Sequence, residues 1–171
     1  IPVSLVPRGA PAEQRYVLFV GYPWKLKGVD LLIQALNRIS PRHPDVRLRI
    51  VGWCDDRTPF EQLAAGNPLI EFFEPVPNEQ AMEMIAGCEV FALASRTDAF
   101  ARVLVEAMAA ERPIVASRVD GTPHYILDGE RGLLFESENI EDLALKLDQL
   151  LSDPAEARRL AVVFRAKVID A

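Results

Sequence analysis

Residues Ala92–Ser117, ALASRTDAFARVLVEAMAAERPIVAS, indicate the fold class, because their pattern is typical of a strand, a loop, a helix and a second strand in succession. The apolar run before Ser95 is short and suits a buried strand. The segment 101–110 consists of strong helix formers without Gly or Pro. Pro113 then leads into the apolar run 114–116. We therefore predict a strand–loop–helix–strand unit here.

Two carboxylates flank the start of the predicted helix. Asp98 lies in the loop before it, and Glu106 lies eight positions later in a nearly apolar helix, where an unpaired carboxylate is costly. The free N–H groups and the dipole of a helix start favour an anion. Such a site, with an acid on either side, suits a sugar nucleotide. A structural interpretation is also open, in which Asp98 is a cap and Arg102 forms an exposed ion pair with Glu106.

Strands and helices alternate along the rest of the chain. Besides the central stretch, we predict strands over 16–21, 46–51, 69–73 and 132–135, and helices over 29–39, 58–65, 78–86, 140–151 and from 153 onward. Asn78 and either Asn139 or Ser137 are predicted helix caps. This alternation predicts an α/β fold, a Rossmann-like doubly wound parallel sheet of about six strands in the order 3-2-1-4-5-6.

Three loops should meet at one edge of this sheet. They follow Gly21, Phe73 and Ser95 at the carboxyl ends of predicted strands, where ligands of such sheets bind. The strand ending in Gly21 leads through a loop to a helix, a general phosphate-binding geometry, but the G-x-G-x-x-G and Walker A patterns are absent. The sequence therefore disfavours a dehydrogenase or an NTPase.

Composition limits the remaining classes. The 171 residues suit one domain, and the net charge of -6 argues against nucleic acid as the main partner. Cys54 and Cys88 lack metal-ligand spacing, and no apolar run is long enough to span a bilayer, so we expect a cytoplasmic protein. Residues 1–15 contain LVPRG, typical of a cleavage tag, and form a linker or tag-like segment. The predicted nucleotide-sugar-binding domain is 16–171.

The central stretch resembles the signature of the retaining GT-B glycosyltransferases of the sucrose synthase and glycogen synthase-like group, the group 1 glycosyl transferases. That signature has two glutamates separated by seven residues, an alanine-rich helix and a Pro-Val-Val-Ala-like strand; Asp98 and Glu106 form the pair here. The resemblance extends from about Tyr16 to about Lys167. It implies the C-terminal, donor-binding half of a two-domain enzyme. The partner would be an N-terminal acceptor-binding domain absent from this chain, through which the enzyme could associate with a membrane.

The resemblance also implies roles for individual residues. Asp98 would be the catalytic residue, facing the donor sugar and the positive charge that develops at its anomeric carbon. Glu106 would bind the ribose hydroxyls, and Lys27 with the amides opening the helix would neutralise the diphosphate. No metal or cofactor is implied; the substrate would be an NDP-sugar such as a UDP- or GDP-hexose. The implied nucleotide-binding residues are Gly21, Lys27, Ala101, Arg102, Val103 and Glu106.

The sequence departs from the family pattern at several places. Asp98 is one methylene shorter than glutamate, Ala99 and Ala101 replace glycines, and Tyr22 replaces an arginine whose charge Lys25 could supply. Two alternatives to a transferase therefore stay open. One is a non-catalytic nucleotide-sugar-binding or scaffolding module, and the other is a sugar-nucleotide epimerase-like half-domain. The resemblance also suggests that Val76 and Pro77 contact the base.

Overall fold

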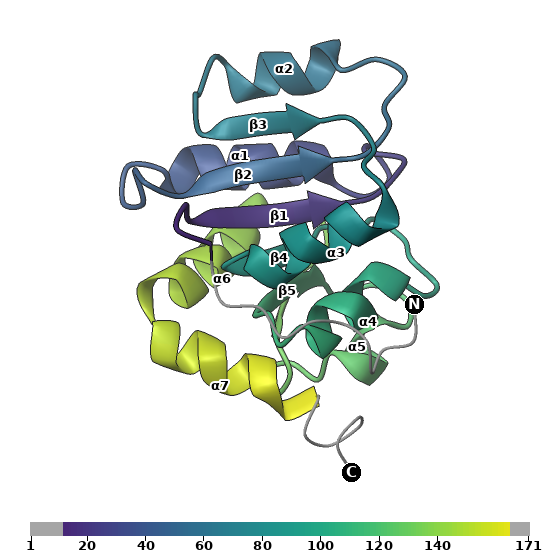
Figure 1. Ribbon diagram of the computed structural model, residues 1–171, viewed down its shortest axis with the longest axis vertical. Helices are drawn as coiled ribbons and strands as arrows, with labels where there is room; N and C mark the ends of the chain where they lie inside the picture. The colour runs from purple at the N-terminus through teal and green to yellow at the C-terminus, as the bar shows by residue number, and fades with distance from the viewer. Residues whose placement is uncertain (1–11, 165–171) are drawn as a thin grey trace.

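One sheet of six parallel strands, in the order β3-β2-β1-β4-β5-β6, organises the part of the chain that the computed structural model describes, residues 12–164 (Figure 1). The strands are β1 (Tyr16–Val20), β2 (Arg47–Val51), β3 (Ile70–Phe73), β4 (Val90–Leu93), β5 (Ile114–Ser117) and β6 (Leu133–Phe135). The helices are α1 (Val29–Ile39), α2 (Thr58–Ala64), α3 (Asn78–Gly87), α4 (Arg102–Ala109), α5 (Thr122–Tyr125), α6 (Ile140–Ser152) and α7 (Pro154–Phe164). Residues 1–11 of the predicted linker and 165–171 of the predicted domain lie outside the described residues.

The predicted α/β Rossmann-like fold and strand order are confirmed. β1 pairs with β2 on one side and with β4 on the other, so the direction of winding reverses between β1 and β4. β4 and β5 are buried along their whole length, as expected for strands covered on both faces. Such a reversal places a crevice at the carboxyl edge of the sheet, between the loops that follow β1 and β4.

Helices cover both faces of the sheet. In Figure 1, α1 lies behind the strands, and α3 and α4 lie in front of them. The α1 helix turns an apolar face inward, on which Leu32, Ala35, Leu36 and Ile39 are buried. In α4, Leu104 and Ala107 to Ala109 are buried. This helix is therefore fixed by packing, because eight residues would be marginal as an isolated helix.

Three details correct or refine the sequence-based expectations. Asn139 caps α6, its side chain accepting from the N–H of Asp142. Asn78 does not cap α3, because it is already the first helical residue and the extended Pro77 precedes it. The segment around Pro123, which lies outside the predicted strands and helices, contains the one-turn helix α5. Proline is well tolerated in a first helical turn, because the N–H groups there lack an intrahelical acceptor.

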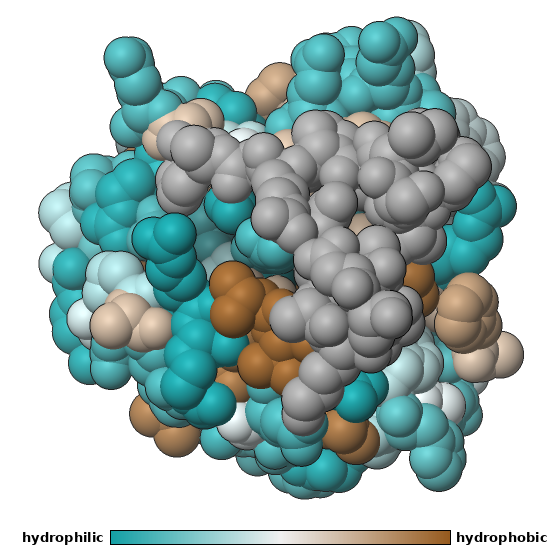
Figure 2. Space-filling model, turned by 60° about the horizontal axis from the view of Figure 1, so that its bottom comes forward, coloured by the Kyte–Doolittle hydropathy of each residue, from teal (hydrophilic) through white to brown (hydrophobic). Residues whose placement is uncertain are grey.

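The outer surface is mainly polar. Figure 2 shows the lower side of the molecule, where hydrophilic side chains surround a central group of apolar ones. Over residues 12–164, none of the helices combines the length and the apolar character that a membrane span needs.

Candidate active site

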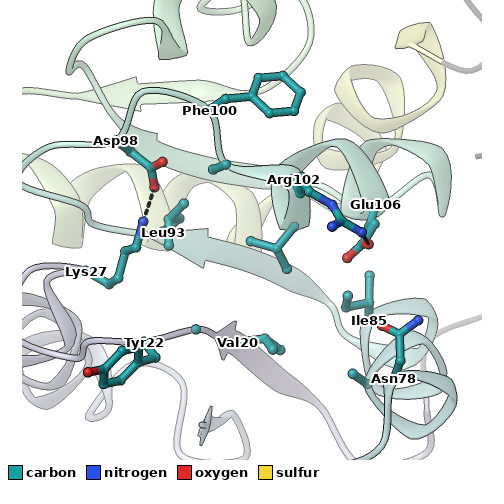
Figure 3. A pocket seen from close by; sticks show the side chains of 14 residues that line it. Val20, Tyr22, Lys27, Asn78, Ile85, Leu93, Asp98, Phe100, Arg102 and Glu106 are labelled. Atoms are coloured by element: carbon teal, nitrogen blue, oxygen red, sulfur yellow. Dashed lines mark hydrogen bonds and ion pairs between the residues drawn. The ribbon is translucent and has the colours of Figure 1, made fainter. Parts of the chain in front are cut away.

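A cleft of about 380 Å³ opens at the carboxyl edge of the sheet, beside the ends of β1 and β4. In Figure 3, Lys27 and Asp98 lie at one end of this cleft, Glu106 and Ile85 lie at the other, and Leu93 lies between them. All seven residues predicted for the site line it. The full lining is Val20, Gly21, Tyr22, Lys27, Asn78, Ala81, Ile85, Leu93, Asp98, Phe100, Ala101, Arg102, Val103 and Glu106.

Lys27 and Asp98 form an ion pair across the crevice. The Nζ of Lys27, from the loop between β1 and α1, lies 2.6 Å from Oδ2 of Asp98, from the loop between β4 and α4. The same oxygen accepts a hydrogen bond of 3.2 Å from the hydroxyl of Ser95. The Asp98 side chain is 6% exposed and that of Lys27 is 21% exposed. The pair therefore holds both charges where water reaches them poorly.

The backbone around Asp98 is fastened from its other side by Asp120. This carboxylate accepts a hydrogen bond of 2.7 Å from the Thr97 hydroxyl and one of 2.6 Å from the N–H of Asp98. The two donors, first the Thr97 hydroxyl and then the amide, lower the pKa of Asp120. The carboxylate therefore stays ionised at neutral pH and fixes the loop that presents Asp98.

Glu106 lies on the face of α4 that borders the cleft. Its side chain is 18% exposed, so it does not project into bulk solvent. Arg102 approaches it at 4.0 Å, but the Arg102 side chain is 78% exposed. An ion pair of this length and exposure contributes little. The predicted helix pair therefore exists, and it leaves the Glu106 carboxylate available to a ligand in the cleft.

The start of α4 offers backbone donors to the cleft. The Ala101 N–H makes a long hydrogen bond of 3.5 Å to the hydroxyl of Tyr125. Within residues 12–164, the amides of Arg102 and Val103 have no protein acceptor. Two free N–H groups at the positive end of a helix dipole form a site for an anion. They lie on the stretch of chain that joins Asp98 to Glu106.

The substitution of glycine by Ala101 does not strain the backbone. Ala101 has φ -86° and ψ 93°, an extended conformation that any residue adopts. Lys25 is not a cleft residue, because it points to Asp30, with its Nζ 2.7 Å from that carboxylate. The arginine replaced by Tyr22 thus has no lysine in its place, and the exposed Tyr22 ring instead packs against Trp53 at 5.0 Å.

Sequence reasoning missed part of the lining. The α3 residues Asn78, Ala81 and Ile85 border the end near Glu106, whereas Val76 and Pro77 are not among the lining residues. A helical spacing of three or four positions puts these α3 residues on one face, but only the packing of α3 beside α4 directs that face to the cleft. In residues 12–164 no three His, Cys, Asp or Glu side chains gather as a metal site would require.

Relatives of known sequence cover most of this chain. It is 33% identical over 163 residues to the D-inositol 3-phosphate glycosyltransferase of Corynebacterium aurimucosum, covering 90% of this chain and 38% of that protein. It is 30% identical to the GDP-mannose-dependent alpha-(1-6)-phosphatidylinositol monomannoside mannosyltransferase of Mycolicibacterium smegmatis, covering 84% and 40%. The chain thus spans about two fifths of the length of these curated relatives.

Solved structures show the same fold. WaaG, a glycosyltransferase involved in lipopolysaccharide biosynthesis, matches 93% of this chain with 28% identity and a TM-score of 0.80, over 44% of its own length. The C-terminal domain of a group 1 glycosyl transferase, LpcC of Francisella tularensis, matches 98% of this chain and 96% of its own, with 22% identity and a TM-score of 0.84. Residues 5–162 match the family described as glycosyl transferases group 1, and the chain therefore belongs to that family.

Proposed function

We propose that this chain is the donor-binding half of a retaining glycosyltransferase that moves a hexose from an NDP-sugar to an acceptor held by a separate N-terminal domain. One observation carries the proposal: an ammonium, free helix amides and two carboxylates of α4 and its preceding loop converge on one cleft. A solved structure of HepE of Anabaena with UDP-glucose shares this fold at a TM-score of 0.82 and 23% identity.

The proposed mechanism divides the donor among these groups. The Glu106 carboxylate accepts hydrogen bonds from the ribose hydroxyls at its end of the cleft. The diphosphate lies against the amides of Arg102 and Val103, and Lys27 balances its charge as the bond to the anomeric carbon breaks. Positioned donors of this kind stabilise a leaving group that gains negative charge in the transition state. These residues can supply this stabilisation from the protein itself.

Asp98 serves the sugar side of the reaction. Its carboxylate faces the donor hexose and stabilises the positive charge that develops at the anomeric carbon. The acceptor hydroxyl then attacks from the side on which the diphosphate leaves and gives its proton to the departing diphosphate oxygen, so that the bond to the diphosphate breaks and the configuration is retained. The shorter reach of aspartate is compatible with this role, because Asp98 lies on the cleft wall and its loop is held by Asp120.

Calorimetry with UDP, GDP and their hexose conjugates tests donor binding. Glu106→Gln removes a charged acceptor of the kind that contributes about 1.5–3 kcal/mol, so we expect nucleotide affinity to fall at least about tenfold. Glu83→Gln is a matched control, because Glu83 is exposed on the neighbouring α3 and does not line the cleft. The proposal is wrong if neither nucleotide binds, or if both variants bind like the wild type.

A further inference from the structure

Arg96 lies at the junction of the two loops that carry Lys27 and Asp98, and it does not line the cleft. Its guanidinium donates two parallel hydrogen bonds to Asp30, from Nη1 to Oδ1 and from Nη2 to Oδ2, both 2.9 Å long. Nη1 also donates to the carbonyl oxygen of Lys25. The backbone N–H of Arg96 donates to the carbonyl oxygen of Leu26 at 2.9 Å. One residue therefore binds the segment 25–30 at three places.

The acceptor of this arginine is itself well fixed. Asp30 is 7% exposed and lies in the first turn of α1. Gly28, two residues earlier, touches the chain next to Arg96 so closely that a Cβ would come within 1.9 Å of the Ala94 carbonyl oxygen. The two loops are thus pressed together, and Lys27 lies in the middle of the segment that Arg96 holds.

Among the described residues, the Lys27 ammonium has one ion-pair partner, Asp98 at 2.6 Å, and its stem does not fix its position. A lysine places a compact charge on a flexible four-carbon stem, whereas an arginine paired through two parallel bonds is planar and rigid. A binding group that is held in place before the ligand arrives does not have to lose that freedom on binding. The rigid arginine can therefore orient the flexible lysine through the backbone of the segment 25–30, to which it is hydrogen-bonded.

We propose that Arg96, through Asp30, is a positioning residue that holds the Lys27 ammonium in place for the donor diphosphate. The inference rests on the proposed function, because it assumes that Lys27 contacts the diphosphate. Arg96 itself stays outside the cleft and touches neither the nucleotide nor the sugar. If its effect on binding passes through Lys27, that effect disappears once Lys27 is replaced, whereas an effect through the loop that carries Asp98, or through folding in general, persists.

A double-mutant cycle on the 171-residue chain tests this dependence. Calorimetry measures the affinity for UDP and GDP in the wild type, Arg96→Met, Lys27→Met and the double variant. We expect Arg96→Met alone to weaken binding about tenfold. In the Lys27→Met background the same change should cost less than about twofold, because no ammonium remains to be misplaced. Arg96→Lys should recover part of the loss. Equal losses in both backgrounds, or no loss in either, would overturn the proposal.

A control variant and a replacement variant accompany the cycle. Arg96 is held by two carboxylates, Asp30 and, at 3.0 Å, Glu138. Arg118→Met is the matched control, because Arg118 is also held by two, Asp128 at 2.8 Å and Glu136 at 3.0 Å, but lies after β5 and outside the cleft. It should leave affinity unchanged. If Arg96→Met does not fold, Asp30→Asn replaces it in the same cycle. A wild type that binds neither nucleotide refutes the proposed function, whereas tight binding with additive losses refutes only the role of Arg96.

Discussion

Gly28 allows a sharp test of how the β1–α1 loop meets the β4–α4 loop. It has φ +71°, and an added Cβ would lie 1.9 Å from the Ala94 carbonyl oxygen and 2.6 Å from the carbonyl carbon. Gly66 has φ +72° with nothing within 4 Å of its added Cβ. Alanine at either position suffers the same backbone strain, but only at Gly28 must a backbone move. The two substitutions therefore separate strain from steric contact.

The expected magnitudes follow from these contacts. A left-handed alanine costs about 1–2 kcal/mol, of which about 0.4–1 kcal/mol is offset by the lower entropy of the unfolded chain. Gly66→Ala should therefore lower the free energy of unfolding by about 0.5–1 kcal/mol. Gly28→Ala adds an overpacking cost of about 1–3 kcal/mol, and its total should reach about 1.5–4 kcal/mol.

Circular dichroism follows the unfolding of both variants, in urea for the free energy of unfolding and on heating for the melting temperature. For a chain of this size each kcal/mol lowers the melting temperature by about 2–4 °C, so Gly28→Ala should melt roughly 3–16 °C below the wild type. Displacement of the loop should also weaken nucleotide binding, whereas Gly66→Ala should not. If the two variants are equally stable, the close approach of Gly28 to Ala94 does not hold the loops together and the reasoning fails.

Three further predictions concern single groups. Ala65→Gly should raise the free energy of unfolding by about 0.5–1 kcal/mol in urea titrations, because Ala65 ends α2 with φ 50°. Burial raises the pKa of Asp30, but hydrogen bonds from the cations Arg96 and Lys25 outweigh burial and hold that pKa below its ordinary value. The ionised Asp30 therefore stabilises the fold above about pH 4, and this stabilisation is lost as the pH falls. Asp30→Asn should destabilise the fold more at pH 7 than at pH 3. Burial raises the pKa of Cys88 to about 12, so at pH 8 a thiol reagent should modify Cys54 alone until urea exposes Cys88.

The sequence predicts the sheet well because each strand shows its own local signal. Runs such as 16–21 and 114–117 are apolar, short and bounded by Gly, Pro or polar loops, and helical segments alternate with them. Such alternation restricts the topology to a few right-handed arrangements. The strand order observed is the one expected for this class. Local pattern and global topology therefore lead to the same architecture.

Features that depend on tertiary contacts could not be predicted in this way. Asn78 has a side chain that often caps helices, but Pro77 occupies the capping position and Asn78 is already the first helical residue. The bond between Arg96 and Asp30 joins residues 66 positions apart, and no spacing rule connects them. The α3 lining of the cleft likewise follows from the packing of α3 against α4.

The candidate site was predictable to the extent that its groups are close in sequence. Asp98, Glu106 and the amides between them lie within nine residues, so the strand–loop–helix unit brings them together without help from the rest of the chain. Lys27 is distant in sequence, and the resemblance to a known family implied its place. The structure brings it within 2.6 Å of Asp98.

The pairing of Lys27 with Asp98 has a consequence for the proposed reaction. A diphosphate that draws the Lys27 ammonium toward itself removes the main partner of a carboxylate that is only 6% exposed. A buried carboxylate without a cation is costly, and in the proposed mechanism the anomeric carbon of the same donor would lie nearby. The positive charge that develops there as the diphosphate leaves would replace the lost ammonium. Donor binding and transition-state stabilisation are then coupled, because the lysine that stabilises the leaving group is the one that frees the carboxylate for the sugar.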